Sequence, residues 1–548
     1  MSVPSPRPAT VTTVDALVVG AGLAGLYMLH RLRGLGLDTV VVEAGDGVGG
    51  TWYWNRYPGA RCDVESLEYS YSFSTELEQE WEWTEKYPTQ PEILRYVEHV
   101  ADRFGLRDGV RLSTSVTAAH WDDARGRWHV TTDAGDAYDA EQLVMATGCL
   151  SMAKTPEVPG TDSFAGRTFH TGHWPHEKVD FTGRRVAVIG TGSSGIQTIP
   201  MIAEEAAELT VFQRTPNFSM PASNRPLDPA DQAERKRTYR EHRQAARTSG
   251  FGVPVEAATQ SALEVSDAER DARYEAAWGV NLVGLLSSYT DTIVDRAAND
   301  TAAEFVRRKI RETVTDPQVA ETLSPRDHPF GTKRPCLDTN YYATYNRDHV
   351  HLVDLKATPL AEITPRGVRT SEREYEVDDL VFATGFDAMT GALLAIDVVG
   401  RDGATLRERW ADGPTTNLGL QVAGFPNLWM ITGPGSPSVL SNMMVSIEQH
   451  VDFVADCLAY AHDRGETVVE STPEAETEWT EHVRVVGEAT LYPQANSWYM
   501  GSNVPGKPRR FMAYIGGVGA YREHCDDLAA RGYPGFAFST PRAVPAPA

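Results

Sequence analysis

Residues 14–25 read VDALVVGAGLAG, an apolar run that ends in glycines at positions 20, 22 and 25. The residues that follow, LYMLHRLRGLG, repeat apolar side chains at the period of a helix. Strand, glycine turn and helix in this order form a dinucleotide-binding unit, because Gly20, Gly22 and Gly25 let the backbone approach a pyrophosphate at the helix N-terminus. Glu43 ends the next strand, TVVVE, where a carboxylate binds ribose hydroxyls. The combination predicts a bound dinucleotide.

A second copy of this unit follows the strand RVAVIG. Gly190, Gly192 and Gly195 precede IQTIPMIAEEAAEL, which again has the helical period. The strand after that helix, LTVFQ, ends in Gln213 and Arg214, with no acid at the ribose position. A carboxylate there would repel a 2′-phosphate, whereas an arginine pairs with it. The second unit is therefore predicted to bind NADPH rather than NADH.

Two dinucleotide sites in one chain suggest that FAD receives hydride from NADPH. The electrons then pass to a disulfide, to another acceptor or to dioxygen. The cysteines are few and widely spaced, and they form no C-x-x-C pair: Cys62, Cys149, Cys336, Cys457 and Cys525. This excludes disulfide reductases and gives no zinc motif, so no metal is implied and oxygen activation is favoured.

Length and charge restrict the class of protein further. The chain has 548 residues, enough for three or four domains at about 150 residues each. Its 51 basic and 75 acidic residues give a net charge of −24, which repels phosphate backbones and anionic lipids. There is no apolar run near the ~18 residues of a membrane span and no secretory leader. We expect a cytoplasmic protein with neither nucleic acid nor membrane as a partner.

The expected fold class is α/β, with two Rossmann-like dinucleotide-binding domains and a helical insertion. LVMATG and LVFATG echo each other and are each expected to close one domain. The insertion is rich in Ala, Glu, Arg and Asp, and either shapes a substrate cavity or serves packing alone. The predicted boundaries are a flexible N-terminus at 1–12, an FAD-binding domain at 13–148 and 384–540, an NADPH-binding domain at 149–222 and 331–383, the insertion at 223–330 and a disordered tail at 541–548.

The stretch between the two glycine loops, FAGRTFHTGHWP, reads F-x-G-x-x-x-H-T-x-x-W-P. It resembles the fingerprint of type I Baeyer–Villiger monooxygenases, class B flavoprotein monooxygenases. The resemblance covers essentially the whole chain and is closest to the branch of phenylacetone and steroid monooxygenases. The segments that carry it are GGTWYWNRYPGARCDVES (49–66), GTGSSGIQ (190–197), FGTKRP (330–335), ATGFD (383–387) and SWYMGSNVPGKPR (497–509).

The resemblance implies NADPH- and O2-dependent oxidation of ketones to esters or lactones. It also implies that the oxygenating species is a C4a-peroxyflavin held by Arg334 and bound NADP+. Such an anion needs a fixed cation that does not protonate it, and a guanidinium meets that need. The partners implied are a ketone and O2, with no obligate protein partner.

The family pattern transfers to named positions of this chain. Arg334 in FGTKRP matches the active-site arginine, and Asp63 in ARCDVES matches a carboxylate that orients it near the flavin. His170 and Trp174 are expected to be linker residues rather than catalytic ones. The predicted FAD contacts are Gly20, Gly22, Gly25, Glu43, Thr51, Trp52, Asp63, Tyr69, Val116 and Met443. The predicted NADP contacts are Gly190, Thr191, Gly192, Ser193, Ser194, Gly195, Gln197, Arg214, Thr215, Lys333, Arg334 and the mobile-loop Trp498, and the predicted substrate loop is Ser438, Val439 and Leu440.

Two other functions stay open. One is a flavin monooxygenase that oxygenates nitrogen or sulfur. Its fingerprint is similar but lacks the W-P ending and a match to Arg334. The other is a non-catalytic flavin-binding redox sensor, against which the intact glycines and the set of Glu43, Arg214 and Arg334 argue.

Overall fold

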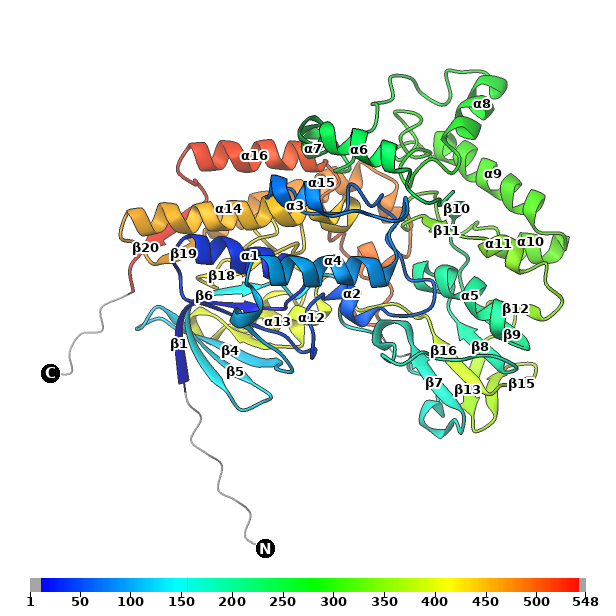
Figure 1. The fold of residues 1–548 in the computed structure, drawn as a ribbon, viewed down its shortest axis with the longest axis horizontal. Helices are drawn as coiled ribbons and strands as arrows, with labels where there is room; N and C mark the ends of the chain where they lie inside the picture. The colour runs from blue at the N-terminus through cyan, green and yellow to red at the C-terminus, as the bar shows by residue number, and fades with distance from the viewer. Residues whose placement is uncertain (1–10, 155, 542–548) are drawn as a thin grey trace, which may run out of the picture.

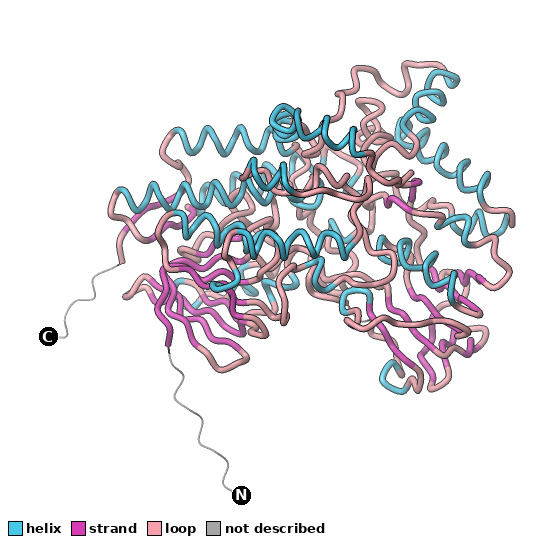
Figure 2. Tube along the Cα trace, in the orientation of Figure 1, coloured by secondary structure: helices cyan, strands magenta, loops and turns pink. Residues whose placement is uncertain are grey.

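The computed structural model describes residues 11–154 and 156–541, whose two largest sheets are separate and surrounded by helices (Figures 1 and 2). Residues 1–10 of the predicted N-terminal segment and 542–548 of the predicted tail lie outside the described residues. Both glycine loops connect a strand to a helix, as the sequence predicts. The fold is α/β with two dinucleotide-binding units.

The first sheet carries the N-terminal glycine loop. Its order is β17-β4-β5-β6-β1-β2-β3, with β18 also paired to β6. Alternate residues along β1 enter two different cores, since Ala16 and Val18 pack under the helices while Leu17 and Val19 pack on the other face. The strands are β1 (Val11–Val19), β2 (Thr39–Val42), β3 (Val110–Arg111), β4 (Val116–Asp122), β5 (Arg127–Thr132), β6 (Ala137–Met145), β17 (Asp397–Val399) and β18 (Leu428–Met430).

The predicted flexible segment 1–12 is wrong at its C-terminal end, because β1 already begins at Val11. Val11 and Thr12 pair with Ala137 and Tyr138 of β6. Val11, Thr12 and Thr13 are β-branched but exposed, so they add no buried position to the apolar run, and pairing with β6 extends the strand.

The second sheet carries the other glycine loop and has the order β12-β9-β8-β16-β7, all parallel. A three-stranded antiparallel sheet, β13-β14-β15, lies beside it (Figure 1). The strands are β7 (Arg167–His170), β8 (Arg185–Ile189), β9 (Glu208–Gln213), β12 (Val350–Asp354), β13 (Leu360–Thr364), β14 (Gly367–Thr370), β15 (Glu374–Glu376) and β16 (Asp379–Phe382).

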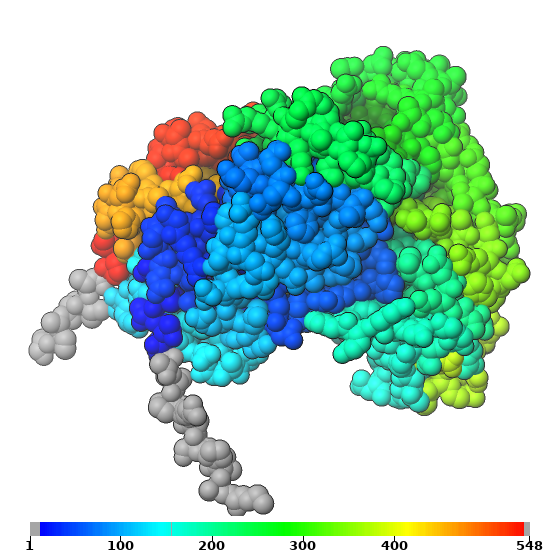
Figure 3. Space-filling view, in the orientation of Figure 1, coloured from blue at the N-terminus to red at the C-terminus, as the bar shows by residue number. Residues whose placement is uncertain are grey.

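A helical segment separates β9 from β12 in the chain. A small parallel pair, β10 (Ser219–Pro221) and β11 (Cys336–Asp338), holds its two ends together. In the space-filling view, the surface of this helical segment lies against the N-terminal region and reaches α16 (Figure 3). The helices are α6 (Pro229–Arg237), α7 (Tyr239–Thr248), α8 (Asp267–Ala277), α9 (Arg296–Thr313) and α10 (Pro317–Leu323).

The remaining helices cover the sheets and connect them. α1 and α14 pack together over the first sheet, and α5 packs on the second (Figure 1). These helices are α1 (Leu23–Gly34), α2 (Thr51–Trp54), α3 (Thr75–Glu80), α4 (Gln90–Arg103), α5 (Ser193–Glu205), α11 (Tyr341–Thr344), α12 (Gly391–Leu394), α13 (Leu406–Arg409), α14 (Met443–Asp463), α15 (Pro473–Glu488) and α16 (Val518–Ala530). A separate antiparallel pair joins β19 (Val468–Ser471) to β20 (Phe536–Ser539). The domain limits themselves stay a prediction.

Candidate active site between two dinucleotide-binding loops

The first glycine loop is a close-packed turn. A Cβ on Gly20, whose φ is +104°, would lie 2.6 Å from the Ala146 carbonyl oxygen. A Cβ on Gly25 would lie 1.8 Å from the carbonyl oxygen of Gly20. No side chain caps the N-terminus of α1, which starts after Gly22, so its first N–H groups stay free for an anion. These features fit the pyrophosphate of a dinucleotide.

Glu43 is buried at the end of β2 beside this loop. Its Oε2 accepts from the Ala21 amide at 2.7 Å, and its Oε1 accepts from the Gly45 amide at 2.8 Å. Burial raises the pKa of this carboxyl, while the two amide bonds act in the opposite direction. The amide of Thr114 donates to the Glu43 carbonyl, and Val116 begins β4 two residues further along the chain. The two amides fix the carboxylate where a ribose is expected.

The other predicted FAD contacts divide between a loop and two helix starts. Trp52 in α2 is buried, and its Nε1 donates to the Tyr69 hydroxyl at 3.1 Å. Thr51 is exposed at the first turn of α2, directly after Gly50, which approaches Gly22 of the glycine loop. Met443 begins α14 and packs between two hydrophobic cores.

The second glycine loop repeats the geometry of the first. A Cβ on Gly190 would lie 2.4 Å from the Ala383 carbonyl oxygen, and one on Gly195 would lie 2.3 Å from the Gly190 carbonyl oxygen. A Cβ on Gly192 would meet no atom within 4 Å, so the space before α5 is open. No side chain caps α5. The loop therefore also fits a pyrophosphate.

Polar side chains tie the second loop to its surroundings. The Thr191 hydroxyl donates to the Thr215 carbonyl at 3.1 Å, and the Cys336 thiol donates to the Ser193 hydroxyl at 3.2 Å. The Ser194 and Thr171 hydroxyls lie 3.2 Å apart.

Gln197, on α5, connects the two nucleotide-binding regions. It accepts from the Tyr57 hydroxyl at 2.8 Å and donates to the Arg61 carbonyl at 3.0 Å. The second loop is thereby fixed against the segment that carries Asp63.

Positive charge gathers past the end of β9. Arg214 is exposed, and its guanidinium makes no ion pair with any residue that the structure describes. The pKa of Lys333 is lowered mainly by burial and further by the charge of Arg214, and the pKa of Lys154 is lowered by the same two causes. Lys333 and Lys154 thus each lie close enough to Arg214 for the two charges to repel, where the sequence predicts the NADP 2′-phosphate.

Arg334 and Asp63, the predicted catalytic pair, form a two-point ion pair. Arg334 Nε donates to Asp63 Oδ2 at 2.7 Å, and Nη2 donates to Oδ1 at 2.8 Å. Arg334 Nη1 donates to the Val439 carbonyl at 2.8 Å. Burial opposes the charge, but Asp63 outweighs it and raises the pKa of the guanidinium above its ordinary value. The cation is fixed in position and stays charged.

A cavity of about 170 Å³ lies beside this pair. Arg334 and Asp63 form part of its wall, together with Val439 and Leu440 of the predicted substrate loop, which is the turn η5 (Ser438–Leu440). Ser438 does not line it, since its hydroxyl is fully buried and donates to the Thr432 carbonyl. Residues 251–254 and 281–286 of the helical insertion supply apolar side chains, so the insertion shapes the cavity.

Several wall residues were not predicted from the sequence. Tyr499 lies next to Trp498 in the SWYMG motif, and burial raises its pKa to about 12 despite the Arg334 charge and hydrogen bond. Glu68, Arg235 and His242 also line the cavity. Only the neighbourhood of Trp498 could have indicated Tyr499, and no motif marks the other three.

Trp498 lies in the turn η7 (Trp498–Met500), half-buried against Tyr499 with ring centroids 4.0 Å apart. The loop that follows is docked onto the ATGFD segment. Asn503 Nδ2 donates to the Phe386 carbonyl at 2.7 Å, and Lys507 Nζ donates to Asp387 Oδ1 at 2.5 Å. The loop therefore closes this side of the site.

His170 and Trp174 have structural surroundings. His170 Nδ1 accepts from the Gly172 amide, Nε2 lies 3.1 Å from the Lys154 carbonyl, and burial lowers the pKa of the ring. Trp174 stacks on Phe169 at 5.2 Å. Both residues hold the strand β7 region together rather than facing the cavity.

Known proteins resemble this chain over nearly its full length. A Baeyer–Villiger monooxygenase of Pseudooceanicola batsensis is 42% identical over 95% of this chain and 95% of its own. A solved structure of oxidized steroid monooxygenase bound to NADP is 55% identical and has a TM-score of 0.93, covering 97% of this chain and 100% of the other. The chain belongs to the Baeyer–Villiger monooxygenase family. The family prediction made from the fingerprint is confirmed.

Two further comparisons delimit the family's chemistry. A phenazine N-monooxygenase of Lysobacter antibioticus is 41% identical over 96% of this chain and 97% of its own. The family model for pyridine nucleotide-disulphide oxidoreductases matches residues 17–267. All five cysteines here are free and buried, so that match reflects the shared nucleotide-binding fold and not thiol chemistry. Over the described part of the chain, no helix is long and apolar enough to cross a membrane.

Proposed function

We propose that this protein oxidises ketones to esters or lactones, using NADPH and O2. The observation that carries the proposal is the Arg334–Asp63 pair in the wall of a cavity that the insertion encloses. Family membership and the two glycine loops support FAD and NADPH as the cofactors. When bound, FAD supplies the activation of dioxygen and NADPH supplies the electrons.

In this proposal Arg334 is the cation that stabilises negative charge on the oxygen atoms of the reacting centre. A preorganised cation in a site closed to water is worth more than one in solution, because nothing must reorient during the reaction. Asp63 is a positioning residue, since its two oxygens occupy Nε and Nη2 and leave Nη1 on the Val439 side. The pKa of Arg334, raised by Asp63 against burial, keeps the group from donating a proton.

The remaining predicted residues have supporting roles in the same proposal. Trp498 and Tyr499 exclude water from one side, because their loop is docked onto residues 383–387. Arg214 and Lys333 bind the 2′-phosphate. Glu43 binds the FAD ribose. A cytoplasmic location is proposed on the odd number and wide spacing of the cysteines.

Product analysis tests this function directly. The holoenzyme is given NADPH and 18O2 with phenylacetone, cyclohexanone, progesterone or 2-octanone, and NADPH consumption and product mass are followed. The expected result is an ester or lactone that carries one labelled oxygen. NADPH oxidation that yields hydrogen peroxide alone with every ketone contradicts the proposal.

Oxygenation of nitrogen is a second candidate function, because the phenazine N-monooxygenase is 41% identical to this chain and the Baeyer–Villiger monooxygenase of Pseudooceanicola batsensis is 42% identical. The same assay with phenazine and with thioanisole as substrates distinguishes the two. An N-oxide or sulfoxide without any ester product would assign this second function. If NADPH does not bleach the bound flavin, the result would assign the remaining alternative, a non-catalytic flavin-binding redox sensor.

A further inference from the structure

Most of the N–H groups of Arg334 are already bound to protein. A guanidinium carries five N–H groups and accepts no hydrogen bond. Nε and Nη2 each donate to the Asp63 carboxylate, and Nη1 donates to the Val439 carbonyl at 2.8 Å. Two N–H groups remain, one on Nη1 and one on Nη2. Arg334 therefore supplies charge to the reacting centre but few donors to a ketone oxygen.

Tyr499 lies in the wall of the same cavity, beside this guanidinium. Burial raises the pKa of its hydroxyl to about 12, although the charge of Arg334 and a hydrogen bond to it act in the opposite direction. Because a guanidinium only donates, the Tyr499 oxygen is the acceptor in that bond. The hydroxyl keeps its own proton at neutral pH, and this proton points away from Arg334 toward another acceptor.

The protein provides no such acceptor among the described residues. The Tyr499 oxygen is not enclosed by protein, because the residue lines the cavity and its hydroxyl is open to it. The hydroxyl of Tyr289 is different, since it also has no partner but is fully buried and lies outside the cavity wall. An O–H group that is open to a cavity donates to the molecule that occupies it.

Neighbouring groups hold the ring of Tyr499 in place. The residue is only 2% exposed, and its ring centroid lies 4.0 Å from that of Trp498 and 5.4 Å from that of Tyr492. Its backbone carbonyl accepts from the Met512 amide at 3.0 Å, which fixes the turn η7 to the chain that follows the docked loop. The hydroxyl therefore has a fixed position beside Arg334 and does not have to reorient during a reaction.

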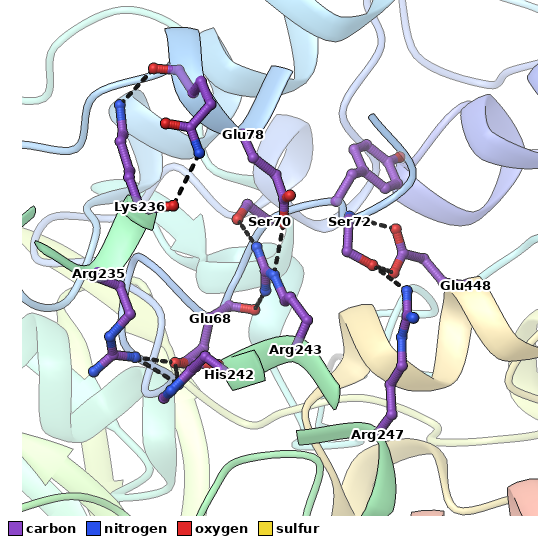
Figure 4. A network of polar contacts seen from close by, with 12 residues as sticks. Glu68, Ser70, Ser72, Glu78, Arg235, Lys236, His242, Arg243, Arg247 and Glu448 are labelled. Atoms are coloured by element: carbon purple, nitrogen blue, oxygen red, sulfur yellow. Dashed lines mark hydrogen bonds and ion pairs between the residues drawn. The ribbon is translucent and has the colours of Figure 1, made fainter. Parts of the chain in front are cut away.

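Several other polar side chains of the wall are bound to protein. Arg235 of α6 and His242 of α7 converge on the Glu68 carboxylate, and Oε1 accepts from Arg235 Nη1 at 2.6 Å (Figure 4). Asn442 Nδ2 donates to the Glu68 carbonyl at 3.0 Å. These donors hold the wall together, whereas the proton of Tyr499 is directed at the contents of the cavity.

We propose that the Tyr499 hydroxyl donates a hydrogen bond to the carbonyl oxygen of the ketone, beside Arg334, and stabilises the negative charge that develops on this oxygen. The inference rests on the proposed function and adds a catalytic residue to it. Two donors of different kinds then meet the same oxygen, the cation Arg334 and a neutral hydroxyl. Tyr499 keeps its proton throughout, so it adds no proton transfer to the reaction.

The variant Tyr499→Phe removes the hydroxyl and keeps the ring in its packing. The holoenzyme is assayed with phenylacetone and 2-octanone for ester formation, and without ketone for flavin reduction by NADPH and for release of hydrogen peroxide. We expect kcat/KM for ester formation to fall about tenfold, the loss typical of one hydrogen bond. Flavin reduction and peroxide release without ketone are expected to equal those of the parent protein, because neither involves a ketone oxygen.

The matched control is Tyr289→Phe. It removes an unbonded hydroxyl from another buried tyrosine, one that does not line the cavity. All three rates are expected to equal those of the parent protein. FAD content after purification reports on folding in both variants.

The outcomes are distinct. Ester formation by Tyr499→Phe at the parent kcat/KM, or an equal loss in Tyr289→Phe, overturns the inference while the proposed function stands. Faster peroxide release by Tyr499→Phe without ketone also overturns it, because the hydroxyl would then act by holding Arg334 or by excluding water. If the parent protein forms no ester from any ketone although NADPH reduces the flavin, the proposed function itself has failed.

Discussion

The two glycine loops have the same backbone but opposite charges at the end of the neighbouring strand. After the first loop, β2 is followed by Glu43, a buried carboxylate held by two backbone amides. After the second, β9 ends at Gln213, whose Nε2 donates to the Thr322 carbonyl, and is followed by the exposed Arg214. In the proposed function, the first site accepts hydrogen bonds from a ribose and the second pairs with a phosphate.

The difference shows that the choice of cofactor is separable from the fold of the cofactor-binding loop. The close contacts at Gly20 and Gly25 recur at Gly190 and Gly195, because both loops must turn a strand into a helix around a pyrophosphate. The discriminating groups, Glu43 and Arg214, lie at the end of the neighbouring strand in each unit, although Glu43 also accepts a hydrogen bond from the Ala21 amide of its turn. Substitutions in the shared turn, at the distinct strand ends and at the junction between the two regions test this difference.

The largest effect is expected at the junction, from Arg334→Ala. Ketone oxygenation falls about 10²–10³-fold, because one preorganised charge is lost from the reacting centre, while NADPH still bleaches the flavin. Labelled ester and flavin absorbance measure the two steps separately. Arg334→Lys keeps the charge but not the two-point pairing with Asp63, so an intermediate rate is expected. Ester formation at the parent rate in Arg334→Ala would remove the role proposed for this residue.

Paired alanine substitutions test whether the two turns are equivalent. Gly25→Ala and Gly195→Ala each place a Cβ within 2.3 Å of a carbonyl oxygen. Overpacking of about 1–3 kcal/mol lowers affinity about 10–100-fold, for FAD in the first variant and for NADPH in the second. FAD content after purification and NADPH titration measure these losses. Gly34→Ala in α1, where a Cβ meets nothing within 4 Å, is the control, and its cofactor affinities should be unchanged.

The strand ends are tested by Arg214→Ala. The Kd for NADPH should rise about tenfold, while the Kd for NADH should change little, because only NADPH has the 2′-phosphate. Arg240→Ala removes an equally exposed arginine on α7 and controls for net charge. Equal weakening of both nucleotides by Arg214→Ala would mean that the residue acts on the fold and not on the phosphate.

The last prediction concerns stability rather than catalysis or cofactor binding, and the effect of pH has opposite signs in the two regions. Burial lowers the pKa of His450 on α14 to about 3, and burial raises the pKa of Asp338 on β11 to about 6. The unfolded histidine binds a proton that the folded one does not, so stability is lost as pH falls below about 6.5. The folded Asp338 keeps a proton that the unfolded one releases, so stability is lost as pH rises from about 4 to 6.

Urea denaturation of the parent protein, His450→Asn and Asp338→Asn between pH 4 and 7.5 measures how each group makes the free energy of unfolding depend on pH. Within each window, the free energy of unfolding of the parent minus that of the variant should change by about 1.4 kcal/mol per pH unit. This difference should fall toward acid pH for His450 and toward neutral pH for Asp338. Differences that do not vary with pH would show that neither group is titrating as its burial implies.

The sequence predicts most of the fold because local rules act there. Glycine spacing, helical periodicity and the strand-end residues Glu43 and Arg214 each depend on neighbours within about 25 residues. The start of β1 was missed because Val11 is paired through its backbone alone. Ser438 was assigned to the substrate loop, yet its hydroxyl turns away from the cavity toward Thr432, a direction that no motif specifies.

The sequence by itself determined the two nucleotide sites, the family and the pair Arg334 and Asp63. Only the tertiary structure showed that Glu68 meets Arg235 and His242, because those contacts join segments 167 and 174 residues apart in the chain. Residues that contact a cofactor common to the family keep a recognisable spacing. Residues that line a cavity are brought together by packing between distant segments, and such contacts leave no spacing in the sequence.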